Sequence, residues 1–292
     1  MGWLHLVVMG ATGVAAMRAA LERGDLDEAV RQGALAGPAV VERALTSADR
    51  TTRLAGIAAA PQVEDRAELL EPLARIAAGP DRRTALPAAA AARTIARELA
   101  RRDRADDLAP DDVAAWRAAW AELARSRDRW IELRLIALDT AAALDPAGIG
   151  IGVGDDLAAA LHDPDPAFRR AAATIVPLPV PAASYAALAD AVVHDTDPEV
   201  ALGAAQSLCM SIDSASDSAP GQAPGPAPGP AIDQASARPV LDALGGAGLA
   251  RLRALVQSDR PDAAARSAAA RCLTADASPE SAAAVRAMRP AH

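Results

Sequence analysis

The sequence predicts an all-α fold, an α/α superhelix in which about six helix pairs stack into a solenoid. Apolar residues make up 51% of the chain but include a single Phe and a single Tyr, so the apolar content is chiefly Ala, Leu and Val. Ala and Leu favour helices, whereas sheets draw on β-branched and aromatic residues. Two further observations, a recurring segment and a recurring aspartate, divide the chain into repeats.

Six segments align on a common reference position, and each has a small residue three places later. The reference residues are Arg53, Pro87, Arg134, Arg169, Ala201 and Arg266. The small residues are Gly56, Ala90, Ala137, Ala172, Ala204 and Ala269. A small side chain at a shared position is what two closely packed helices require.

An aspartate lies four places before the reference position in four of the six segments, at Asp49, Asp165, Asp197 and Asp262. Aspartate accepts a hydrogen bond from the free amides of a helix start, and proline, which follows two of these residues, is favoured at the first helical position. Apolar residues eight places before the reference, at Leu45, Leu161 and Val193, mark the end of a preceding helix. Each repeat is therefore expected to be helix, turn, helix.

The spacing between reference residues divides the chain into regions. Four steps of 34, 47, 35 and 32 residues fit one helix pair each, and the last step of 65 holds a stretch rich in Pro, Gly, Ser and Ala. Such a stretch buries too little apolar surface to become ordered. We expect an N-terminal capping region at 1–23, helix pairs at 24–210, a disordered insertion at 211–239 and a last pair with its C-terminal cap at 240–292.

A D-x-D-P turn occurs in two segments, LHDPDPAFRRAAATIV at 161–176 and VHDTDPEVALGAAQSL at 193–208. These segments resemble bacterial HEAT repeats, in which such a turn leads into an inner helix beginning φ-R-x-x-A. The segments at 45–60 and 256–273 are similar but looser, and the second and third repeats lack the aspartate at its place. The resemblance implies antiparallel helix pairs in a curved superhelix whose concave face binds a partner. It implies no catalytic residue. Bilin lyases and alkylpurine DNA glycosylases are enzymes on similar repeats; no motif here singles out the first, and the acidic chain disfavours the second.

Charge and cysteine content limit the partner and the compartment. The net charge of −8 disfavours nucleic-acid binding, which needs a concentrated positive field, so we expect a protein partner, with an acidic partner as one candidate, and a monomer. No run of 18 apolar residues predicts a membrane span. Cys209 and Cys272 are too few and too isolated for a disulfide framework, so we interpret them as small buried residues of a cytoplasmic protein. A signal peptide over residues 1–20 stays an alternative, although it would lack a basic start.

Two glycine-rich segments raise the alternative of an NAD-type enzyme. The N-terminal LHLVVMGATG resembles the strand and glycine turn of a dinucleotide-binding domain, and GIGIGVGDD follows at 148–156. Ala16 and Ala19 stand where further glycines would be expected, and no alternation of strands and helices follows. A capping helix and a loop between repeats are the preferred interpretations, and no cofactor, metal or catalytic residue is predicted.

Histidines and tryptophans supply two further candidate sites. His162 and His194 share one repeat position, each followed by an aspartate, but helices 8–10 Å apart would keep them from sharing a metal ion, so we expect solvent-facing turn residues. Three of the four tryptophans gather at Trp116, Trp120 and Trp130. An exposed cluster would be a binding hot spot, but the 3,4 spacing within 113–123 favours core packing.

The main candidate for partner binding is a line of arginines. Arg93, Arg97 and Arg101 fall at i, i+4 and i+8 of one predicted helix, so they share one face. Like charges at that spacing are mildly unfavourable, which leaves either a solvated face or a site for an anion or acidic partner. The sequence thus predicts a non-catalytic protein-interaction scaffold, with a nucleic-acid-binding or glycosylase-like repeat and an NAD-type enzyme as alternatives.

Overall fold

A computed structural model describes residues 13–101, 109–144, 153–176, 180, 182–217, 234–257 and 263–288 of the chain. Within these residues every regular element is a helix, which confirms the all-α prediction. The chain divides into two compact units, Met1–Pro146 and Ala147–His292. None of the helices in this described part has the length and apolar content needed to cross a membrane.

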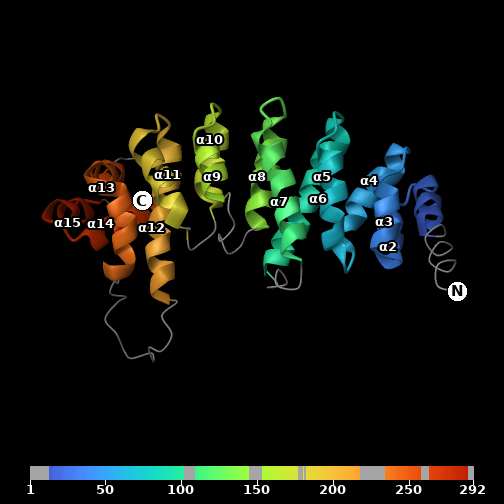
Figure 1. The fold of residues 1–292 in the computed structure, drawn as a ribbon, viewed down its shortest axis with the longest axis horizontal. Helices are drawn as coiled ribbons and strands as arrows, with labels where there is room; N and C mark the ends of the chain where they lie inside the picture. Colours follow the sequence, from blue (N-terminus) through green and yellow to red (C-terminus); the bar gives the residue numbers. More distant parts are fainter. Residues whose placement is uncertain are drawn as a thin grey trace. The chain divides into compact units, whose positions relative to one another are not determined.

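The first unit is a two-layer stack of helix pairs (Figure 1). After a helix over residues 13–22 come α2 (Leu26–Ala36), α3 (Pro38–Leu45), α4 (Arg50–Ala59), the 3-10 turns η1 (Ala60–Gln62) and η2 (Arg66–Leu69), α5 (Leu70–Ala77), α6 (Arg82–Arg101), α7 (Pro110–Arg125) and α8 (Ile131–Ala143). The pairs are α3 with α4, α5 with α6 and α7 with α8. One layer runs through the first helices of the pairs and the other through α2, α4, α6 and α8.

The second unit repeats this arrangement. Its helices are α9 (Val153–Leu161), α10 (Pro166–Ile175), α11 (Ala182–His194), α12 (Pro198–Asp217), α13 (Gln234–Gln257), α14 (Ala263–Asp276) and α15 (Pro279–Arg286). The layer of first helices contains α9, α11 and α13, and the other contains α10, α12 and α14. A kink divides α13 at Gly245, whose φ of 56° is in the left-handed region that glycine adopts without strain.

The helix-turn-helix repeat was predicted correctly, because every reference residue lies on the second helix of a pair. Three of the four recurring aspartates cap those helices. The carboxylates of Asp49, Asp165 and Asp197 accept hydrogen bonds from backbone amides two or three residues later, at 2.7–2.9 Å. Asp262 lies outside the described residues.

The alignment of the second repeat was wrong by two residues. Helix α6 begins at Arg82, and the Asp81 carboxylate accepts hydrogen bonds from the Arg83 amide at 3.1 Å and the Thr84 hydroxyl at 3.2 Å. The buried small residue of this repeat is therefore Ala88, whereas Ala90 is only half-buried. A run of alanines fits several registers equally well, so it could not fix this one.

The predicted insertion at 211–239 was too long at both ends. Helix α12 continues to Asp217 and α13 begins at Gln234. Ile212 and Ala237, both inside the predicted insertion, are fully buried. Residues 218–233 lie outside the described part of the chain.

The N-terminal region is more than a cap. Met17 and Ala20 of the helix over 13–22 are fully buried against Ala29 of α2 and Val40 of α3. The Asp25 carboxylate caps α2 by accepting a hydrogen bond from the Glu28 amide at 2.9 Å. This helix and α2 therefore form an additional pair, ahead of the first aligned segment.

The core is built mainly from small side chains. More than half of the completely buried apolar residues in the described regions are alanines. Gly56 of α4 shows how closely the helices approach, because a Cβ atom at this position would lie 2.9 Å from the Ala44 Cβ and 3.1 Å from the Leu45 amide nitrogen. The recurring small residue therefore allows the two helices of a pair to make contact.

Candidate binding surfaces

The arginine line is in place on α6, and two of its members pair with one carboxylate. Arg97 donates two hydrogen bonds to Asp139 of α8, from Nη2 to Oδ2 at 2.6 Å and from Nε to Oδ1 at 3.3 Å. The Nε of Arg93 lies 3.8 Å from the same carboxylate, whose side chain is 13% exposed. Two of the predicted partner-binding residues thus also connect neighbouring helix pairs.

Arg101, at the exposed end of the line, has no ion-pair partner among the described residues. The nearest acid on α6, Glu98, forms an ion pair with Arg66 at 2.7 Å. Among the described residues of this face, three guanidinium groups and one carboxylate leave an excess of two positive charges, although the whole chain carries −8. Spacing within one helix predicted the line, but it could not identify Asp139, because that residue comes from another helix.

Arginines at the reference position have a structural role that sequence analysis missed. Arg53 donates from Nη1 to the Ser47 carbonyl at 3.0 Å, and Arg169 donates from Nη1 to the Asp163 carbonyl at 2.9 Å. The buried Arg134 donates from Nε to the Ala124 carbonyl at 2.9 Å. Each of these arginines therefore hydrogen-bonds a backbone carbonyl near the turn that precedes its own helix.

Arg169 also joins two successive repeats. Its Nε and Nη2 donate to the two carboxylate oxygens of Asp195 at 2.8 and 3.1 Å, and the side chains are only 15% and 6% exposed. Burial opposes ionisation of Asp195. The hydrogen bonds from Arg169 and from the Asp197 amide outweigh burial and hold the pKa of Asp195 below its usual value.

The two repeat-position histidines border a groove of about 380 Å³ in the second unit. Their side chains are 65% and 72% exposed, as predicted, but both contact Asp190 of α11. His194 Nδ1 lies 2.8 Å from one carboxylate oxygen and His162 Nε2 lies 3.5 Å from the other. In the part of the chain that the structure describes, no three His, Cys, Asp or Glu side chains are placed to hold a metal ion.

A similar groove of about 400 Å³ lies at the corresponding place in the first unit. It is lined by the end of α3 at Leu45, by Arg53, by Ile76 of α5 and by the turn residue Asp81. In both units the groove forms where the turn of one pair meets the end of the next first helix. The grooves are therefore products of the repeat.

The tryptophans do not form an exposed cluster. Trp120 of α7 is completely buried, which confirms core packing at this position, and Trp116 and Trp130 are half-buried. The Arg82 guanidinium lies 5.9 Å from the centre of the Trp130 ring. That contact joins α6 to the start of α8.

The glycine-rich segments lie largely outside the described residues, at 4–12 and 148–152. The described part of the first segment, from Gly13, is helical, and α9 follows the second. The NAD-type alternative therefore gains no strand or phosphate-binding turn from the described residues.

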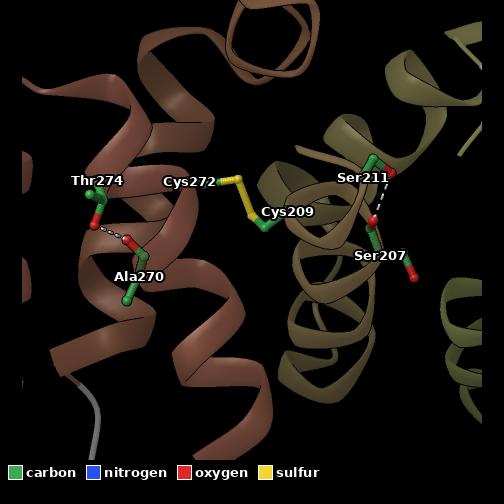
Figure 2. The surroundings of a disulfide bond; sticks show 6 residues. All are labelled: Ser207, Cys209, Ser211, Ala270, Cys272 and Thr274. Carbon is green, nitrogen blue, oxygen red and sulfur yellow. Dashed lines mark hydrogen bonds between the residues drawn. A yellow bond between two sulfur atoms is a disulfide. The ribbon is translucent and has the colours of Figure 1, made fainter. Parts of the chain in front are cut away.

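The interpretation of the cysteines as free buried residues was wrong in one respect. Both are completely buried, but they form a disulfide between α12 and α14, with the Cα atoms 5.3 Å apart (Figure 2). Their separation of 63 residues hid the pairing, because it depends on the stacking of two helix pairs. An expectation of a reducing compartment therefore loses its support from the cysteines.

Comparison with known proteins gives no family for this chain. No family model matches it, and no curated protein matches it. Among solved structures, one engineered protein is 20% identical, with a TM-score of 0.49 over 96% of this chain and 66% of its own. A second engineered protein is 17% identical, with a TM-score of 0.32 over 93% of this chain and 87% of its own. The chain thus spans about two thirds of the first structure, and neither likeness carries an argument about function.

Proposed function

We propose that this protein is a non-catalytic interaction scaffold of HEAT-like helix pairs that binds an acidic segment of a protein partner along the arginine line of α6. The proposal includes a superhelical arrangement of the pairs and a monomeric chain. The cytoplasmic location that we expected rested partly on free cysteines, and the disulfide favours an oxidising compartment instead.

One observation carries the proposal, the excess positive charge at residues 93–101. Arg93 and Arg97 share a single carboxylate, and Arg101 is exposed at the end of the same face. Guanidinium groups on a rigid helix can form charge-assisted, two-pronged hydrogen bonds to carboxylates. A partner carboxylate would relieve the repulsion along the line, which Asp139 relieves only in part.

A direct test measures binding of a labelled oligoglutamate peptide to the full chain by fluorescence polarisation. Arg101→Glu should weaken binding several-fold, because it removes two units of local charge, and the remaining affinity should depend less on salt. The matched control is Arg75→Glu on α5, which makes the same change of charge at an exposed position in the other helix layer. Equal binding by the Arg101 variant and the parent would contradict the proposal.

The pair with Asp139 complicates charge reversal at Arg97, because Arg97→Glu alone would face that carboxylate. The double variant Arg97→Glu with Asp139→Arg reverses the pair and keeps the excess of two positive charges. It should therefore bind the acidic peptide as the parent does. Loss of binding in a folded double variant would mean that geometry, not net charge, decides recognition. Tighter binding of an oligonucleotide through the same arginines would favour the nucleic-acid alternative.

A further inference from the structure

The two cysteines of this chain join the parts of the second unit that precede and follow residues 218–233. Cys209 lies on α12, before that segment, and Cys272 lies on α14, after it. The peptide connection between them includes the end of α12, all of α13 and the start of α14. The disulfide therefore links α12 covalently to α14, in addition to the peptide chain that runs between them.

The surroundings of the bond are apolar. Both sulfur-bearing residues are completely buried, next in sequence to the fully buried Leu208 and Leu273. The neighbouring hydroxyl groups of Ser211 and Thr274 donate to carbonyls of their own helices, at 3.1 and 2.9 Å (Figure 2). The disulfide thus lies inside the contact between α12 and α14, and a reductant reaches it only when these helices separate.

We propose that the Cys209–Cys272 disulfide is a redox-controlled clasp that holds α13, α14 and α15 on α12, so that the second unit is complete only in an oxidising compartment. The chain has no third cysteine, so no other pairing within the chain can replace this bond. Without the bond, only non-covalent contacts hold the last three helices on α11 and α12, and the fully buried residues of those helices include small side chains such as Ala237 and Ala269.

Opening of the clasp is ordinary thiol–disulfide exchange with an external dithiol. One thiolate of the reductant attacks a sulfur of the bridge, which releases the other cysteine as a thiol and forms a mixed disulfide. The second thiolate of the reductant then displaces the remaining cysteine. The products are two protein thiols and the oxidised, cyclic form of the dithiol, so two electrons and two protons pass to the protein.

The test compares amide hydrogen exchange, followed by mass spectrometry, in the oxidised full-length chain and in the same chain reduced with dithiothreitol. Reduction adds only two hydrogens, so it opens no cavity. We expect exchange in α13–α15 to become at least tenfold faster on reduction, and exchange in α2–α8 of the first unit to stay the same. The variant Cys209→Ala with Cys272→Ala should exchange as the reduced chain does, and the reductant should not change it further. A change of less than twofold in α13–α15 would overturn the clasp.

The compartment is tested separately in the native cells. Cells are quenched with acid, and free thiols are labelled with a maleimide–polyethylene glycol reagent before gel electrophoresis. We expect no mass shift unless the sample is first reduced, after which two labels should add. Two labels without reduction would show that the cysteines are free in the cell and would overturn the proposal. Neither experiment uses the arginines of α6, so the clasp and the proposed function can fail independently.

Discussion

Replacing Arg169 should show how much the stability of the second unit depends on contacts between its repeats. Arg169→Met keeps a long apolar side chain but leaves the Asp195 carboxylate, 6% exposed, without its bidentate partner. Removing one member of a buried ion pair costs about 3–5 kcal/mol, because the other charge stays desolvated. We expect a loss within that range. Arg169→Lys should cost less, because it keeps the charge but cannot donate in the same two-pronged geometry.

The double variant Arg169→Met with Asp195→Asn separates this pair from its surroundings. The asparagine oxygen can still accept from the Asp197 amide, which lies 2.8 Å from Asp195 Oδ1. The double variant should therefore be more stable than the sum of the single losses implies, by about 1–3 kcal/mol.

The assay is urea denaturation followed by far-ultraviolet circular dichroism, with hydrogen exchange in α10–α12 as the local measurement. Tryptophan emission would not serve, because all four tryptophans belong to the first unit. Strictly additive losses, or an Arg169→Met loss below about 1 kcal/mol, would refute the view that this pair joins the two repeats.

The remaining predictions concern acid, packing and the boundary of the insertion. The folded-state pKa of Asp195 lies below its ordinary value of 3.8. The stability that ionised Asp195 contributes is therefore complete above that value and is lost as the pH falls through the lowered pKa. When the pH is lowered from about 5 to about 3, the free energy of unfolding of the parent should therefore fall more than that of Asp195→Asn, which has no carboxyl group to protonate at this position. Urea midpoints at each pH measure the difference. Gly56→Val should destabilise the first unit by about 1–3 kcal/mol through overpacking against α3, whereas the exposed Ala58→Val should have little effect on the tryptophan-monitored midpoint. Ala237→Asp should destabilise the second unit by several kcal/mol, because it buries an unpaired charge, whereas Arg238→Gln next to it should be nearly neutral. If Ala237→Asp melted at the same temperature as the parent, Ala237 would belong to the insertion after all.

Features that depend on neighbours in the sequence were predictable. The Asp49, Asp165 and Asp197 caps act within three residues, so their spacing was enough to place helix starts. Composition was enough for the helical class. Alanine runs were not enough for register, as Ala88 and Ala90 show, since nothing in an alanine distinguishes a buried position from the next one.

Features that depend on the stacking of pairs were not predictable. Asp139, Asp190 and Cys272 all contact residues of another helix pair or turn, and their partners can be identified only when the register of both pairs is known. The face of α6 that carries the arginines was predicted, but its partial neutralisation was not. The predicted boundary of the insertion was wrong for a related reason. Ala237 resembles its Pro- and Ala-rich surroundings in sequence, and only contact with other helices buries it.

The small side chains of the interior limit how this protein can change over evolutionary time. At a buried site such as Ala172 nearly every substitution adds volume, and at Gly56 even the Cβ atom of alanine would meet Ala44, so drift at these sites is restricted to the smallest residues. Exposed positions on the same helices carry no such restriction. Divergent relatives should therefore keep a periodic pattern of very small residues long after their overall identity has fallen to the level of chance. A search that weights those positions would recognise kinship that whole-sequence similarity overlooks.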